Sequence, residues 1–100
     1  MPATLKDKKV ACLNPNTGRS MKIDKNIYDL ISKNIYHALK EHKALSYTRI
    51  VDEVKKCLRH DNIRFEKSVE WYTVTVKHDM EARGVIKTYM QQGRKQHALA

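Results

Sequence analysis

Hydrophobic residues between Asp24 and Lys43 recur at steps of three and four, which is the spacing of one face of an α-helix. Polar residues such as Lys33 and Lys40 fall on the other faces. Asp24 has the short acceptor side chain that is preferred at a helix N-cap. The pattern therefore predicts a first helix over residues 25–42. Its apolar stripe consists of Ile27, Leu30, Ile31, Ile35, Ala38 and Leu39.

A second helix is predicted over residues 47–58, after Ser46, which also suits an N-cap. Its apolar positions keep the helical spacing and include Cys57, which is therefore expected in the core. Residues 59–67 lose this periodicity and hold five charges, so we expect a loop there.

A third helix is predicted over residues 69–83, with Ser68 as its N-cap. Gly84 follows at the place where a glycine in the left-handed region commonly ends a helix. The apolar stripe of this helix consists of Val69, Tyr72, Val76 and Met80.

Two other stretches predict β-hairpins. Residues 9–13 and 19–23 flank the segment Asn14-Pro15-Asn16-Thr17-Gly18, whose residue types favour a turn. Residues 85–99 form a second hairpin around Gln91-Gln92-Gly93.

The fold class that follows is α+β, in a chain whose 100 residues suffice for one domain. Three helices, the last of which ends at a glycine and leads into a hairpin, have the layout of a winged helix. We expect a flexible N-terminus over residues 1–8 and a single winged-helix-like domain over residues 9–100, in which residues 85–99 are the wing.

The formal net charge of +9 bears on the partners of the protein and not on its fold. Residues 1–43 hold nine Lys or Arg against four Asp or Glu, so most of the excess lies in the N-terminal half. No apolar run is long enough to cross a membrane, and no secretory signal is evident. A cytoplasmic location, with Cys12 and Cys57 as free thiols, is the expectation.

Cationic side chains near the third helix and the wing are the candidates for nucleic-acid binding. Lys77 and His78 are expected on the outward face of the third helix, within reach of phosphates or base edges. The wing carries Lys87, Arg94 and Lys95 without any acidic side chain. Residues 69–83 themselves have a net charge of −1, which opposes binding to a polyanion.

Trp71 and Val74 are apolar residues predicted on the outward face of the third helix. They favour a second interpretation, in which this face binds a partner protein or a second copy of the chain. Packing of Trp71 against the loop, at Phe65, is the structural alternative.

Residue spacing gives no catalytic, cofactor or metal site. The two cysteines and five histidines form no zinc-finger spacing, and His37 and His42 diverge on the first helix. The three glycines are isolated, so no phosphate-binding loop is present. We expect a protein that is not an enzyme, that has no cofactor and for which no small-molecule substrate is evident.

Two segments carry a family resemblance. Residues 69–86 and the segment from Leu13 to Gly18 resemble a family of short, mostly bacterial proteins known as a domain of unknown function. The part from Leu45 onward is similar to winged helix-turn-helix domains, in which a helix ending in Glu-x-Arg-Gly-hydrophobic precedes the wing, as Glu81-Ala82-Arg83-Gly84-Val85 does here. This similarity implies a DNA-binding role. The loop over residues 59–67 is longer than the turn usual in such domains.

The sequence therefore leaves two functions open. The first is weak to moderate binding of double-stranded DNA through its phosphates, as a regulator or accessory factor. The second is a protein-interaction or homodimerisation module that binds no nucleic acid.

Overall fold

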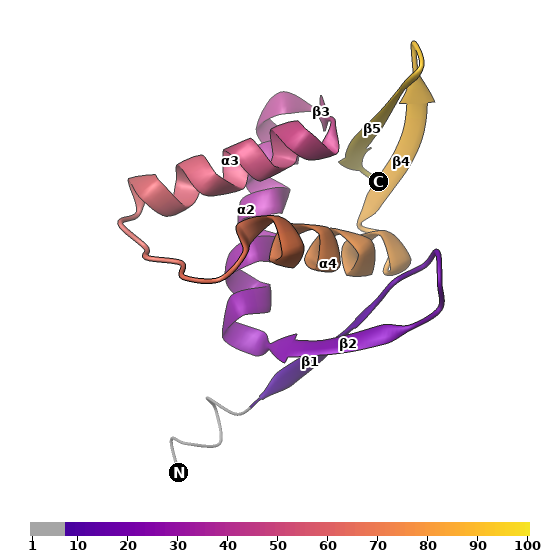
Figure 1. Cartoon of the computed structure of the whole chain (residues 1–100). Coiled ribbons are helices and arrows are strands. Elements are labelled where there is room, and N and C mark those ends of the chain that lie inside the picture. The colour runs from indigo at the N-terminus through magenta and orange to yellow at the C-terminus, as the bar shows by residue number, and fades with distance from the viewer. Residues whose placement is uncertain (1–7) are drawn as a thin grey trace.

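The computed structural model describes residues 8–100, and the residues expected as a flexible N-terminus lie outside this range except for Lys8. Three helices lie between an N-terminal and a C-terminal hairpin, which confirms the predicted α+β layout (Figure 1). The elements are β1 (Lys9–Leu13), β2 (Ser20–Asp24), α2 (Lys25–His42), β3 (Ala44–Leu45), α3 (Tyr47–His60), α4 (Val69–Ala82), β4 (Ile86–Gln91) and β5 (Arg94–Leu99).

The strands form two separate antiparallel sheets. Within residues 8–100, β1 pairs only with β2, and this pair is called the N-terminal hairpin. β5 lies between β3 and β4 in a three-stranded sheet, of which β4–β5 is called the C-terminal hairpin. The C-terminal hairpin projects beyond the helices, with its turn at the far end (Figure 1).

The three helices begin at the predicted residues, and two of the three predicted N-caps form their hydrogen bond. The hydroxyl oxygens of Ser46 and Ser68 accept hydrogen bonds from the backbone N–H groups of Arg49 and Trp71, as N-caps do. Asp24 occupies the N-cap position of α2 but makes no such bond. Its carboxylate instead pairs with Lys9 Nζ at 2.6 Å across the N-terminal hairpin.

Gly84 ends α4 in a Schellman motif, as its position in the sequence predicts. Its φ is +78°, and its N–H donates to the carbonyl of Glu81 while that of Val85 donates to Met80. The chain consequently turns directly into β4. α3, by contrast, continues to His60, two residues beyond the predicted end, so that the loop to α4 spans residues 61–68.

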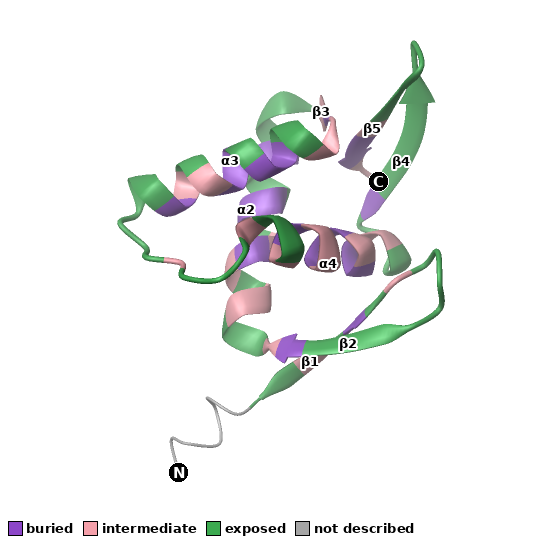
Figure 2. Cartoon of the chain, in the orientation of Figure 1, coloured by how far each residue is buried: buried purple, intermediate pink, exposed green. Residues whose placement is uncertain are grey.

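The core lies where the three helices meet, with the N-terminal hairpin closing one end (Figure 2). The predicted stripes supply most of it, and Cys12 and Ile23 are added from the hairpin. Cys57 was predicted to lie in the core, but it is only half-buried. Side chains that are fully enclosed include Ile31, Ile35, Leu39, Ile50, Val54 and Val76. No helix within residues 8–100 is long and apolar enough to cross a membrane.

Asp79 is a buried carboxylate, 1% exposed, that joins three parts of the fold. Its Oδ1 accepts from the backbone N–H of Leu13 in β1 at 3.0 Å. Its Oδ2 accepts from the hydroxyl of Tyr28 in α2 at 2.5 Å and from Arg83 Nε at 2.6 Å. Burial, together with the bond to Asp79, holds the pKa of Tyr28 well above its ordinary value, so the hydroxyl keeps the proton it donates.

Replacing Asp79 tests this arrangement. Asp79→Asn removes the charge that Arg83 pairs with and places a donor amide where acceptors are needed, so we expect a loss of about 2–4 kcal/mol in unfolding free energy. Urea unfolding followed by circular dichroism measures it. The control is Asp52→Asn, an exposed carboxylate on α3, for which we expect a change within about 0.5 kcal/mol. Equal effects of the two substitutions would contradict the assignment.

Candidate nucleic-acid interface

The register of the C-terminal hairpin distributes its cations over both faces. Directly paired residues of antiparallel strands share a face, and successive residues alternate between faces. Lys87 and Arg94, whose partners are Ala98 and Gln91, therefore lie on one face together with Tyr89. Lys95 pairs with Met90 and lies on the other face.

All three of these cations are exposed, and none forms a salt bridge with another residue in the range 8–100. The chain contains no acidic side chain after Glu81. Gln92 and Gly93, with φ of +51° and +76°, make the tight two-residue turn that joins the strands. The tip is a short turn with cations beside it.

The base of the C-terminal hairpin is held to α4 by a buried polar network. Thr88 donates its hydroxyl proton to Glu81 Oε2, and its oxygen lies 3.0 Å from His97 Nδ1. This network assigns the ring proton of His97 to Nδ1, which donates to Thr88. His97 is 1% exposed, and burial, aided by the Lys77 ammonium, lowers its pKa to about 4. The imidazole is therefore neutral at neutral pH.

Lys77 belongs to this network, and its prediction as an outward phosphate contact is wrong in placement. The residue is 5% exposed, and Nζ pairs with Glu81 Oε1 at 3.2 Å. The ammonium also lies 6.0 Å from the centre of the Tyr47 ring. The physical reason is that α3 and the C-terminal sheet both pack on the side of α4 that helical spacing alone assigned to solvent.

Glu81 gains from the same contacts. Burial raises its pKa, but the hydrogen bond from Thr88 and the charge of Lys77 outweigh this and hold the pKa below its ordinary value. Glu81 is consequently an anion that neutralises Lys77. Within residues 69–83 this leaves Arg83 as the other cation, and Arg83 pairs with Asp79.

His78 does lie toward solvent, half-buried, in a hollow of about 280 Å³ that Lys95 also lines. Burial, followed by the charge of Lys77, lowers the pKa of His78. A neutral imidazole donates or accepts one hydrogen bond but supplies no charge to a phosphate. Of the five predicted nucleic-acid contacts, the structure thus brings Lys77, His78 and Lys95 to one hollow, in which Lys77 is buried and paired with Glu81.

Trp71 and Val74 lie on the open face of α4 and line a groove against the N-terminal hairpin. Trp71 is 40% exposed, and Leu13 and Met21 of the hairpin are 42% and 51% exposed. The groove has a volume of about 570 Å³. The centres of the Trp71 and Tyr72 rings lie 4.8 Å apart in an edge-to-face contact. The ring that contacts Phe65 is that of Tyr72, with the ring centres 5.6 Å apart.

The N-terminal hairpin runs alongside α4 (Figure 1), which the sequence did not indicate. The open face of α4 that remains beside it carries Trp71, Val74, Thr75 and His78, none of them a cation at neutral pH. One signal was available in the sequence. Asp79 sits beside Met80 in the apolar stripe, and a carboxylate there needs a partner from another element.

The buried state of His97 makes stability depend on pH. The unfolded chain binds a proton at His97 below its ordinary pKa of about 6.5, whereas the folded chain does so only near pH 4. Stability from this group is full above about pH 6.5 and falls, by at most about 3 kcal/mol, as the pH drops toward 4.

We expect His97→Asn, which keeps a donor toward Thr88, to flatten the fall in unfolding free energy between pH 6.5 and 4. Urea unfolding at a series of pH values measures the slope. His60→Asn, at an exposed histidine, is the control and should keep the wild-type slope. An unchanged slope for His97→Asn would show that other groups produce the dependence.

The comparisons with known proteins identify a family and nothing beyond it. No curated protein and no solved structure matches the chain. The model of a family of unknown function, DUF6958, matches residues 9–97, a range that includes the N-terminal hairpin, all three helices and all but the last two residues of the C-terminal hairpin. The chain therefore belongs to the DUF6958 family.

Proposed function

We propose that this protein binds double-stranded DNA through its phosphates, with the C-terminal hairpin as the contact element. The observation that carries the proposal is the set of three exposed cations, Lys87, Arg94 and Lys95, on a projecting hairpin without carboxylates. Long cationic side chains on a projecting turn are suited to phosphate contacts.

The layout of the domain supports the same proposal. Three helices followed directly by a hairpin belong to the α+β layout that the sequence predicted, and β3 pairs with β5. The proposal takes this arrangement to be that of a winged helix. In such domains the hairpin lies beside the helix that approaches the DNA. Here α4 presents an uncharged face next to the N-terminal hairpin, so backbone contacts from the C-terminal hairpin dominate and base readout is minor.

Three phosphate contacts make a quantitative expectation. Each contact releases condensed counterions, so the logarithm of the association constant should fall against the logarithm of salt concentration with a slope of about −2 to −3. Fluorescence anisotropy of a labelled duplex, measured over a salt series, gives the slope. Duplexes of unrelated sequence should bind with affinities that agree within a few-fold.

The double substitution Arg94→Gln and Lys95→Gln tests the location of the contacts. We expect the magnitude of the salt slope to decrease by about one for each cation removed, and binding to be weaker at every salt concentration. The matched control is Lys33→Gln with Lys40→Gln, two exposed cations on α2. It removes the same charge from another part of the surface and should leave the slope close to the wild-type value. If both doubles weaken binding equally, attraction is general and the C-terminal hairpin is not the interface.

A second function is favoured by the groove between α4 and the N-terminal hairpin. Leu13, Met21 and Trp71 are large apolar residues that stay more than a third exposed, and such clusters mark protein contacts. A second copy of the chain is the partner that this proposal names. It requires no nucleic acid, and it is compatible with the hairpin contacts because the groove lies elsewhere.

For this function we expect light scattering to report a dimer at high concentration and Trp71 emission to shift to longer wavelength on dilution. Met21→Lys should place a charge in the contact and keep the chain monomeric, since Met21 is half exposed and its replacement leaves the core intact. Met90→Lys, at an exposed methionine on the C-terminal hairpin, is the control. A wild-type chain that stays monomeric at all concentrations would exclude the dimer.

A further inference from the structure

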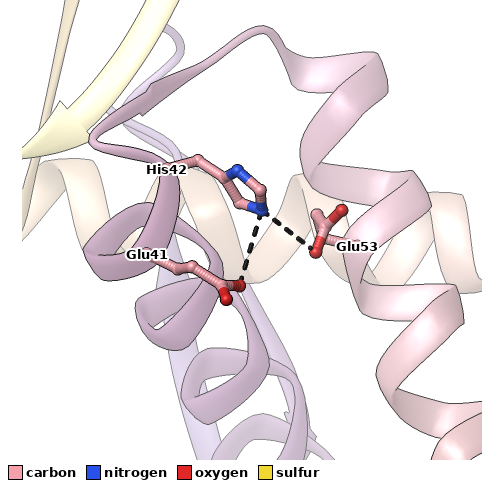
Figure 3. Close-up of side chains that lie close together, drawn as sticks. All are labelled: Glu41, His42 and Glu53. Atoms are coloured by element: carbon pink, nitrogen blue, oxygen red, sulfur yellow. Dashed lines mark ion pairs between the residues drawn. The ribbon is translucent and has the colours of Figure 1, made fainter.

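Glu41, His42 and Glu53 bring three metal-ligating side chains together where the end of α2 faces α3 (Figure 3). His42 Nε2 lies 3.5 Å from Glu41 Oε1 and 3.4 Å from Glu53 Oε1. All three ligand atoms are within 4.8 Å of one another. Figure 3 shows both carboxylates directed toward the same ring nitrogen.

Two of the three spacings in the cluster are those of a tetrahedral coordination shell, and the two carboxylate oxygens lie within 4.8 Å of each other. Zinc binds imidazole nitrogen and carboxylate oxygen at about 2.0–2.1 Å, so neighbouring ligand atoms of a tetrahedral ion lie about 3.4 Å apart. Both distances from His42 Nε2 agree with this value. One nitrogen and two oxygens also form a donor set that first-row divalent ions accept.

The surroundings of Glu53 favour a cation. Its side chain is only 12% exposed, and Lys56, the nearest lysine, contacts the other carboxylate oxygen, Oε2, at 3.5 Å. Oε1 is therefore left to His42. A buried carboxylate requires a positive partner, and a divalent ion held also by Glu41 and His42 supplies one.

A groove adjoins the cluster, and the carboxylates of Glu41 and Glu53 line it whereas His42 does not. Glu41, Glu53 and Asn34 line a groove of about 580 Å³ between α2 and α3. Asn34 is 4% exposed, and its Nδ2 has no hydrogen-bond partner among the described residues. An amide N–H cannot ligate a cation, but it can donate to a water oxygen held in this groove.

We propose that Glu41, His42 and Glu53 bind a divalent transition-metal ion, with zinc as the preferred one and water in the remaining position. The ion joins the last turn of α2 to α3, across the short β3 segment that connects them. Its role is to fix the angle between these two helices. The proposal does not depend on DNA binding, since the C-terminal hairpin contributes no ligand.

Titration of the EDTA-stripped full chain with ZnCl₂, followed by calorimetry, tests the site. We expect one ion per chain, and a Zn²⁺-dependent rise in the thermal midpoint. Glu53→Gln and His42→Ala should each weaken binding by at least about tenfold. Glu41→Gln, at a side chain that is 74% exposed, should do so without any effect on the fold, which circular dichroism checks.

The controls are His37→Ala and His60→Ala, since both histidines line the same groove outside the cluster. They should retain the wild-type affinity within about twofold. Co²⁺ in place of Zn²⁺ should give the strong visible absorption of a tetrahedral ion without a thiolate charge-transfer band. Absence of one-to-one binding, equal weakening in the controls, or a thiolate band from Cys57 would each overturn the assignment.

Discussion

The buried carboxylate of Asp79 is the constraint on which the arrangement of this fold depends. Its two oxygens accept hydrogen bonds from β1, from α2 and from the end of α4 itself. An ionised group with 1% exposure is tolerated only when all of these donors are in place. The cost of leaving it unpaired therefore selects one position for the N-terminal hairpin beside α4. The apolar packing of Cys12 and Ile23 is non-directional, and it further stabilises the hairpin in that position.

The periodicity of the sequence predicted the helices, but it did not predict which of their residues are exposed to solvent. The stripe from Ile27 to Leu39, the serine caps and Gly84 predict the helices because these signals act within one turn of the chain. β3 was missed because two residues are too few to show alternation. Lys77 was predicted to be exposed because a helical wheel identifies only the apolar face of a helix and not the other elements that pack against it. α4 has contacts on three sides, from α2 and α3, from the sheet, and from the N-terminal hairpin.

The candidate site divides in the same way. Arg94 and Lys95 could be found from the sequence because residues beside a hairpin turn are exposed by its own geometry. Lys87 lies nearer the base of the hairpin, opposite Ala98, and is also exposed. The cluster of Glu41, His42 and Glu53 could not, because its ligands come from two helices whose contact is a property of the tertiary fold. His37 and His42 do diverge on α2, as their spacing indicates. That divergence carries no information about a carboxylate that arrives from α3.

The attachment of the N-terminal hairpin has a consequence for where this domain can be cut. A fragment that begins at α2 would retain all three helices and the C-terminal sheet, and by topology alone it would look complete. It would also uncover the core beneath Cys12 and Ile23 and deprive one oxygen of Asp79 of its donor. β1 and β2 are thus an integral part of the domain, because they cover one side of its core. An expression fragment that starts after residue 24 would be incompletely folded and prone to aggregate.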